Sequence, residues 1–140
     1  MIKHTLPNKL SDLGELALKN LEQAIRSPRH RIDMDVYHLG APGLTRCRVC
    51  LAGATMAFTL NTSPGAKYLP ANFPDEVEGC LYAIDWLRKG RVDLGLNSLG
   101  IDASHMKDLN RQIVDFKDDN PAPFFQGMRK LIEDLRAEGY

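Results

Sequence analysis

Two cysteines are the residues of this chain whose type and spacing most resemble a chemical motif. Cys47 and Cys50 form a Cys-x-x-Cys pair within the stretch RCRVCLAGATMAFTL, residues 46–60. Such a pair can hold a metal ion, cycle between dithiol and disulfide, or lie buried as small apolar residues. A structural zinc ion needs four ligands, which Cys80 and His38 would have to complete, and their spacing matches no zinc-binding pattern. We therefore predict a buried helix, with a metal- or thiol-dependent protein as the alternative.

A redox role for this pair would also need a particular surrounding structure. Thioredoxin-like enzymes place the motif in a strand–helix–strand unit, whereas the residues here predict a helix that is apolar or small on nearly every side. Three cysteines and an N-terminus without an apolar run (MIKHTLPNKL) indicate reduced thiols in a cytosolic protein. We expect Cys50 to be buried and reduced, with no disulfide to Cys47 and no bound cofactor.

A second candidate for cation binding is the acidic pair Asp33 and Asp35, followed by His38. Carboxylates two residues apart on an extended segment face the same side and can hold a divalent cation. Such aspartates more often form the solvated face of an edge segment. We adopt that simpler interpretation.

The charge of the chain argues against a surface devoted to nucleic acid. Lys and Arg number 18, and so do Asp and Glu, so the formal net charge is zero. One local basic patch comprises Arg26, Arg29, His30 and Arg31, with Arg46 and Arg48 as further candidates. This patch could contact phosphates, as in a nucleic-acid accessory protein. Alternatively, it is a solvated helix end, where the helix dipole stabilises the positive charge of arginine. We expect at most weak, non-sequence-specific binding, with nucleic acid unlikely as the main partner.

Two aromatic residues form the best candidate for a protein-binding surface. Tyr82 and Trp86 lie four apart on a predicted helix, near the side opposite Val77 and Ile84. If they stand at the surface beside Arg88, they form the kind of aromatic and arginine cluster that dominates interfaces. The alternative is that the helix is buried on two sides.

The elements that must position these residues are mostly helices. Apolar residues three and four apart, with Gly and Pro between the segments, predict helices at about 8–26, 45–61, 74–90, 91–100, 102–116 and 121–138. Alternation at 31–37 predicts one short extended segment packed on helices. Gly53 and Ala57 would allow another backbone to approach. We predict an all-α, compact orthogonal bundle of five to six helices in a single domain, residues 1–140.

Several segments resemble a family of small uncharacterised proteins encoded by bacteriophages and prophages. The resemblance covers the chain from about Leu10 onward and rests on IDMDVYH, CRVCLAGATMAFTL, LYAIDWLRKG and NPAPFFQGMRKLIEDL. Asp35 and Tyr37 stand where the family pattern has Gly and Trp. The family has no established activity, so the resemblance implies only a context, an infected or lysogenic bacterial cell.

Together these features predict a phage-type protein that acts without catalysis by binding another macromolecule. We expect a protein partner or self-association, in the cytoplasm of the bacterial host. The uncharged run Val49–Leu60 has twelve residues, too few to span a bilayer. We expect no membrane partner.

Overall fold

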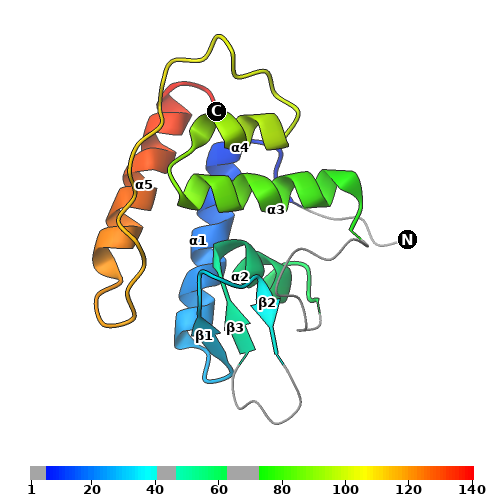
Figure 1. Ribbon diagram of the computed structural model, residues 1–140, viewed down its shortest axis with the longest axis vertical. Helices are drawn as coiled ribbons and strands as arrows, with labels where there is room; N and C mark the ends of the chain where they lie inside the picture. The colour runs from blue at the N-terminus through cyan, green and yellow to red at the C-terminus, as the bar shows by residue number, and fades with distance from the viewer. Residues whose placement is uncertain (1–5, 41–46, 63–72) are drawn as a thin grey trace. The chain divides into compact units, whose positions relative to one another are not determined.

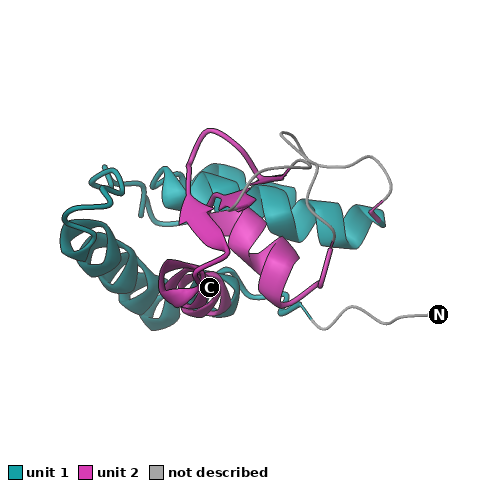
Figure 2. Cartoon of the chain, turned by 90° about the horizontal axis from the view of Figure 1, so that it is seen from below, with its two compact units in different colours: residues 1–15, 74–140 teal, residues 16–73 magenta. Residues whose placement is uncertain are grey.

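The computed structural model describes residues 6–40, 47–62 and 73–140 (Figure 1). Within these residues the helices are α1 (Leu10–Arg26), α2 (Leu51–Phe58), α3 (Asp75–Arg88), α4 (Val92–Ser98) and α5 (Ala122–Ala137), and the strands are β1 (His30–Ile32), β2 (His38–Leu39) and β3 (Cys47–Val49). The chain divides into two compact units, coloured separately in Figure 2. Unit 1 comprises residues 1–15 and 74–140, and unit 2 comprises residues 16–73.

Helix α1 follows the apolar pattern of its sequence closely. The apolar residues at three- and four-residue spacing are fully buried: Leu10, Leu13, Ala17, Leu21 and Ala24. Ile25, which is also apolar, is 41% exposed near the end of the helix. The helix begins in unit 1 and continues into unit 2.

Unit 1 contains α3, α4 and α5, and the predicted helices near these positions are confirmed. Helix α3 begins after Pro74 with three acidic residues in its first turn, where the helix dipole favours negative charge. It is followed by Gly90, whose φ of 75° suits glycine. The predicted core faces of α3 and α5 are buried, and include Val77, Cys80, Leu81, Ile84, Leu87, Met128, Leu131, Ile132 and Leu135.

Glycines permit close packing inside unit 1. A Cβ on Gly79 would lie 2.5 Å from the carbonyl oxygen of Ser98, so α3 and α4 touch backbone to backbone there. A Cβ on Gly14 would lie 2.7 Å from Leu87 Cδ2 and 3.0 Å from Ile132 Cγ1, which are side-chain atoms. The first turns of α1 therefore approach α3 and α5 closely at Gly14.

The prediction of a helix at 102–116 is wrong. Residues 101–120, called the strap here, have no regular secondary structure. The carboxylates of Asp102 and Asp108 accept hydrogen bonds from the backbone nitrogens two residues later, Ser104 at 2.9 Å and Asn110 at 3.0 Å. These local bonds compete with the helical hydrogen-bond pattern.

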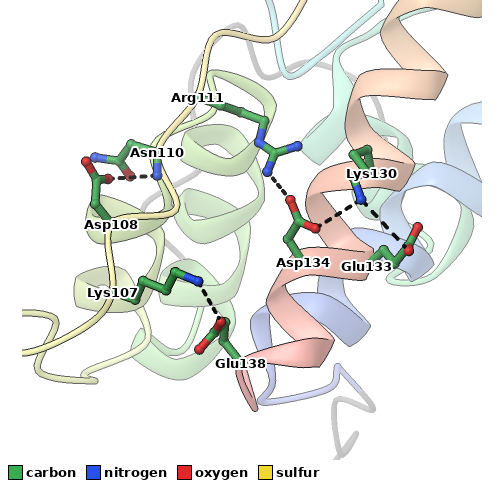
Figure 3. Close-up of polar contacts among 8 residues, drawn as sticks. All are labelled: Lys107, Asp108, Asn110, Arg111, Lys130, Glu133, Asp134 and Glu138. Carbon is green, nitrogen blue, oxygen red and sulfur yellow. Dashed lines mark hydrogen bonds and ion pairs between the residues drawn. The ribbon is translucent and has the colours of Figure 1, made fainter.

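Some apolar residues of the strap still pack inward, although Ile101 and Val114 are exposed. Leu109 and Ile113 are buried, and Phe116 meets the edge of Phe124 at a centroid distance of 5.8 Å. Ion pairs join the strap to α5: Lys107 contacts Glu138 at 3.2 Å, and Arg111 contacts Asp134 (Figure 3). The strap thus lies along α5 and is fixed at both its polar and its apolar positions.

Unit 2 contains a small sheet with the strand order β1-β3-β2. Strand β3 pairs parallel to β1, with His30 opposite Cys47 and Arg31 opposite Arg48. It pairs antiparallel to β2, with His38 opposite Val49. The expectation of an all-α chain is therefore corrected to a helix-rich chain with a three-stranded sheet.

The predicted boundaries in unit 2 also shift. The extended segment expected at 31–37 is mostly wrong: only residues 31–32 belong to a strand, β1, and residues 33–37 form the turn that leads to β2 at His38. The helix expected at 45–61 is shorter, because Cys47–Val49 form a strand and α2 begins at Leu51. Gly53 does admit another backbone, since a Cβ there would lie 1.5 Å from the carbonyl oxygen of Tyr37.

Candidate functional site

The outer face of α3 presents the predicted aromatic pair. Tyr82 is 40% exposed and Trp86 is half-buried, whereas the opposite side of the helix is buried. The Nζ of Lys89 lies 5.1 Å from the centre of the Trp86 ring, within cation–π range. Two-sided burial of this helix is therefore absent at Tyr82 and incomplete at Trp86.

Arg88, the third predicted residue of this surface, has a structural partner. Its guanidinium donates to Asp85 Oδ1 from Nη2 at 3.1 Å and from Nε at 3.3 Å. Asp85 also pairs with Lys89 at 3.5 Å. This network places charged groups at the edge of the aromatic pair, an arrangement typical of the polar rim of an interface.

The structure separates the two cysteines of the Cys-x-x-Cys motif. Cys47 lies on β3, and Cys50 caps α2, accepting a hydrogen bond on Sγ from the Gly53 nitrogen at 3.3 Å. Extended backbone rises about 3.3 Å per residue, so the two Cα atoms lie roughly 10 Å apart. A disulfide requires Cα atoms within about 7 Å. The motif thus acts as a strand end and a helix cap.

Cys80 belongs to unit 1, whereas Cys47, Cys50 and His38 belong to unit 2. Its thiol donates to the carbonyl oxygen of Pro7 at 3.8 Å. Burial, and then the neighbouring Glu76, raise the pKa of Cys80 and keep it a neutral thiol, which is a poor nucleophile and metal ligand. Across the described residues, no group of three or more His, Cys, Asp and Glu side chains is arranged to hold a metal ion.

Two histidines meet on one face of the sheet of unit 2, a feature that sequence reasoning missed. His30, His38 and Cys47 share this face, because register partners on neighbouring strands point to the same side. The rings of His30 and His38 lie 6.4 Å apart, and Phe58 lies 4.8 Å from His30. Only the strand register brings these residues together, so no local signal predicts the pair.

His38 is 2% exposed, and Thr62 links it to α2. The Thr62 hydroxyl lies within hydrogen-bonding distance, 3.1 Å, of the Met56 carbonyl oxygen. The same hydroxyl oxygen lies 3.1 Å from His38 Nδ1. Burial, and then His30, lower the pKa of His38 and favour the neutral imidazole.

His30 has a similar but less enclosed environment. Its Nδ1 lies 2.8 Å from the hydroxyl oxygen of Ser27. Burial, and then the positive charge of Arg29, lower the pKa of His30. The lowered pKa values favour the neutral form of both imidazoles.

A buried amide in α1 makes a further polar cluster in unit 2. Asn20 Nδ2 donates to Thr59 Oγ1 at 2.7 Å and to Thr55 Oγ1 at 3.3 Å. Asn20 stands at a position of the apolar stripe, three residues after Ala17 and four before Ala24. A polar residue at such a position was the available signal, and it indicates a specific internal partner.

The basic patch lies at the end of α1 and on β1. Arg26, Arg29 and Arg31 are exposed, and Arg48 lies beside Arg31 on β3. Arg46 falls outside the described residues.

The acidic pair serves the local structure. Asp33 Oδ2 pairs with Arg48 at 3.3 Å, and Asp33 Oδ1 accepts the backbone nitrogen of Asp35 at 3.0 Å. This geometry fits the turn between β1 and β2, as Asp side chains commonly do.

Comparison of the chain with protein-family models, curated proteins and solved structures finds no match. The resemblance to bacteriophage and prophage proteins therefore stays a prediction. None of the helices in the described part of the chain has both the length and the apolar character needed to cross a membrane.

Proposed function

We propose that this protein acts without catalysis by binding a protein partner through the outer face of α3. One observation supports the proposal: Tyr82 and Trp86 lie on the side of α3 that is not needed to anchor the helix. The opposite side is already buried through Val77, Leu81 and Ile84. Aromatic side chains bury a large area with little loss of side-chain entropy, so they anchor interfaces well.

The biological setting of this proposal comes from the resemblance to phage proteins. The partner would be a protein of the bacterial host or of the phage, or a second copy of the chain, and the site of action would be the bacterial cytoplasm. The charged network of Asp85, Arg88 and Lys89 supplies the rim around the aromatic centre.

The test combines partner capture, self-association and folding for matched variants. Tyr82→Ala with Trp86→Ala removes the aromatic pair, and Val114→Ala removes an apolar side chain of unit 1 that is 54% exposed elsewhere. Wild type and Val114→Ala should capture the same partner from infected bacterial lysate, or form the same oligomer by analytical ultracentrifugation. The aromatic variant should lose that association at least tenfold.

Thermal melting of the single variant Trp86→Ala separates a surface role from a core role. A half-buried Trp should cost less than the roughly 3–5 kcal/mol of a fully buried aromatic. A loss of that full size would make Trp86 a core residue. Unchanged association of the aromatic variant would also refute the proposal, because the pair would then contribute nothing to binding.

A further inference from the structure

The zero net charge of the chain conceals opposite charges on its two units. Unit 2 contains seven Lys and Arg against three Asp and Glu, a net charge of +4. Unit 1 contains eleven Lys and Arg against fifteen Asp and Glu, a net charge of −4. Net charge acts on partners at the level of a surface, so the positive unit has to be considered on its own.

The positive charge of unit 2 includes arginines gathered on one face of the sheet. Arg31 and Arg48 are register partners, so their side chains point to the same side from strands about 4.8 Å apart. Arg29 precedes β1 by one residue, and its carbonyl oxygen accepts the Cys47 nitrogen at 2.7 Å. Arg29 lies in the turn that leads directly into β1. We call the register partners Arg31 and Arg48, together with Arg29 at the start of β1, the arginine face; His30, His38 and Cys47 occupy the opposite face of the sheet.

Adjacent like charges on a sheet destabilise the fold, and here the compensation is partial. Asp33 pairs with Arg48, whose side chain is 41% exposed. Arg29 and Arg31 are exposed, as is Arg26 at the end of α1, and none of the three forms a salt bridge within residues 6–40, 47–62 and 73–140. A bound anion would relieve this repulsion, which gives the arginine face an intrinsic preference for negatively charged ligands.

We propose that the arginine face binds the phosphate backbone of a nucleic acid without reading its sequence. Guanidinium groups present planar pairs of donors that match phosphate oxygens. A protein partner would instead require a desolvated aromatic or apolar centre. The described neutral neighbour of Arg48 on this face is Leu39, which is half-buried. The described face thus offers phosphate contacts, which position a nucleic acid without specifying its bases.

The experiment measures fluorescence anisotropy of labelled single-stranded and duplex DNA of mixed sequence, and of RNA, from about 50 to 200 mM salt. Arg29→Gln with Arg31→Gln is compared with Lys9→Gln and Lys117→Gln. Both double variants remove two exposed cations, and the lysines belong to unit 1 and form no salt bridge in the described structure. Melting curves establish that both variants fold.

We expect micromolar binding at the lowest salt that fades as salt rises. The arginine variant should bind at least tenfold more weakly, and its plot of log K against log salt should be shallower by about 2. The lysine variant should change the affinity by less than about threefold, since its cations lie in the acidic unit.

Three results would overturn the proposal. The first is no binding at the lowest salt, and the second is an equal loss in both variants, which would show a dependence on net charge alone. The third is equally tight binding of polyglutamate, which would assign the arginine face to an acidic protein. The variant without Tyr82 and Trp86 should bind nucleic acid as the wild type does. Failure of this proposal is thereby distinguishable from failure of the α3 proposal.

Discussion

The two units of this protein have different kinds of interior. Unit 1 is built from helices whose buried faces are apolar, and its strap adds apolar anchors at Leu109 and Ile113. Unit 2 contains a short sheet, and the buried polar side chains Asn20, His38 and Thr55 all belong to it. Ser11 is the buried polar residue among the described part of unit 1. Apolar faces tolerate small displacements, whereas hydrogen-bonded polar groups require particular geometry.

This difference predicts which changes should destabilise each unit. Unit 1 should respond mainly to the loss of apolar volume. Unit 2 should be destabilised by atoms added where two backbones are in close contact, and by protonation of its histidines. The following experiments test that contrast, in order of decreasing expected effect.

The largest effect should come from Gly53→Ala in unit 2. The added Cβ would overlap the Tyr37 carbonyl oxygen, and backbone atoms cannot rotate away as a side chain can. The loss of stability should exceed the usual overpacking cost of about 1–3 kcal/mol and also the cost of about 3–5 kcal/mol for truncating a buried aromatic. Urea denaturation followed by circular dichroism measures it.

Gly127→Ala in α5 is the matched control from unit 1. Its Cβ would lie 3.7 Å from Ile113, an ordinary van der Waals contact. Because Ala is a better helix former than Gly, this variant should gain about 0.5–1 kcal/mol. Equal losses at Gly53 and Gly127 would contradict the contrast between the units.

The next effect should come from truncating one core residue in each unit. Phe124→Ala should cost about 3–5 kcal/mol, because Phe124 is 1% exposed between Phe116 and Phe125. Leu51→Ala in unit 2 should cost about 2–5 kcal/mol. Calorimetry then tests the prediction of a single domain: both variants should shift one common transition. Two separate transitions would show that the units unfold independently.

Acid should destabilise unit 2 before unit 1. The pKa values of His30 and His38 lie below the usual value of about 6.5, so the unfolded chain binds protons more readily. The contribution of these two histidines to the stability of the fold is complete above about pH 6.5. It is lost as the pH falls through their folded-state pKa values. In unit 1, the hydrogen bond from Arg111 lowers the pKa of Asp134, whose contribution is lost only below about pH 4.

Stability measured by urea denaturation between about pH 4 and 7.5 tests this order. The wild type should lose stability as the pH falls below about 6.5, and His38→Gln should show a weaker dependence there. Asp134→Asn should leave that region unchanged and alter only the more acidic range. A pH profile of His38→Gln identical to that of the wild type would exclude the histidine as its cause.

The smallest effect concerns the cysteines and leaves stability unchanged. Cys50 and Cys80 are buried, whereas Cys47 is half-buried. We expect thiol labelling of the folded protein to modify Cys47 first, with Cys50 and Cys80 reacting after unfolding. Mass spectrometry of labelled peptides measures the order. Rapid labelling of Cys50, or an oxidised pair that reductant restores, would contradict the separation of the two thiols.

The strap and the cysteine segment show why some elements could not be predicted from the sequence. In the strap, Leu109 and Ile113 recur at helical spacing but pack from an irregular backbone. Strand β3 is three residues long and exists because β1 and β2 pair with it on both sides. Pairing with distant strands leaves no local signal in Cys47–Val49, so the apolar run that follows Cys50 led to the prediction of one longer helix.

Periodic apolar residues and Gly or Pro boundaries act over neighbouring turns, so the sequence predicted the helices α1, α3 and α5. It also predicted the close approach at Gly53. The sheet, the meeting of His30 with His38, and the arginine face could be seen only in the folded chain. Each of these depends on residues from separate segments, and strand register is set by pairing between those segments.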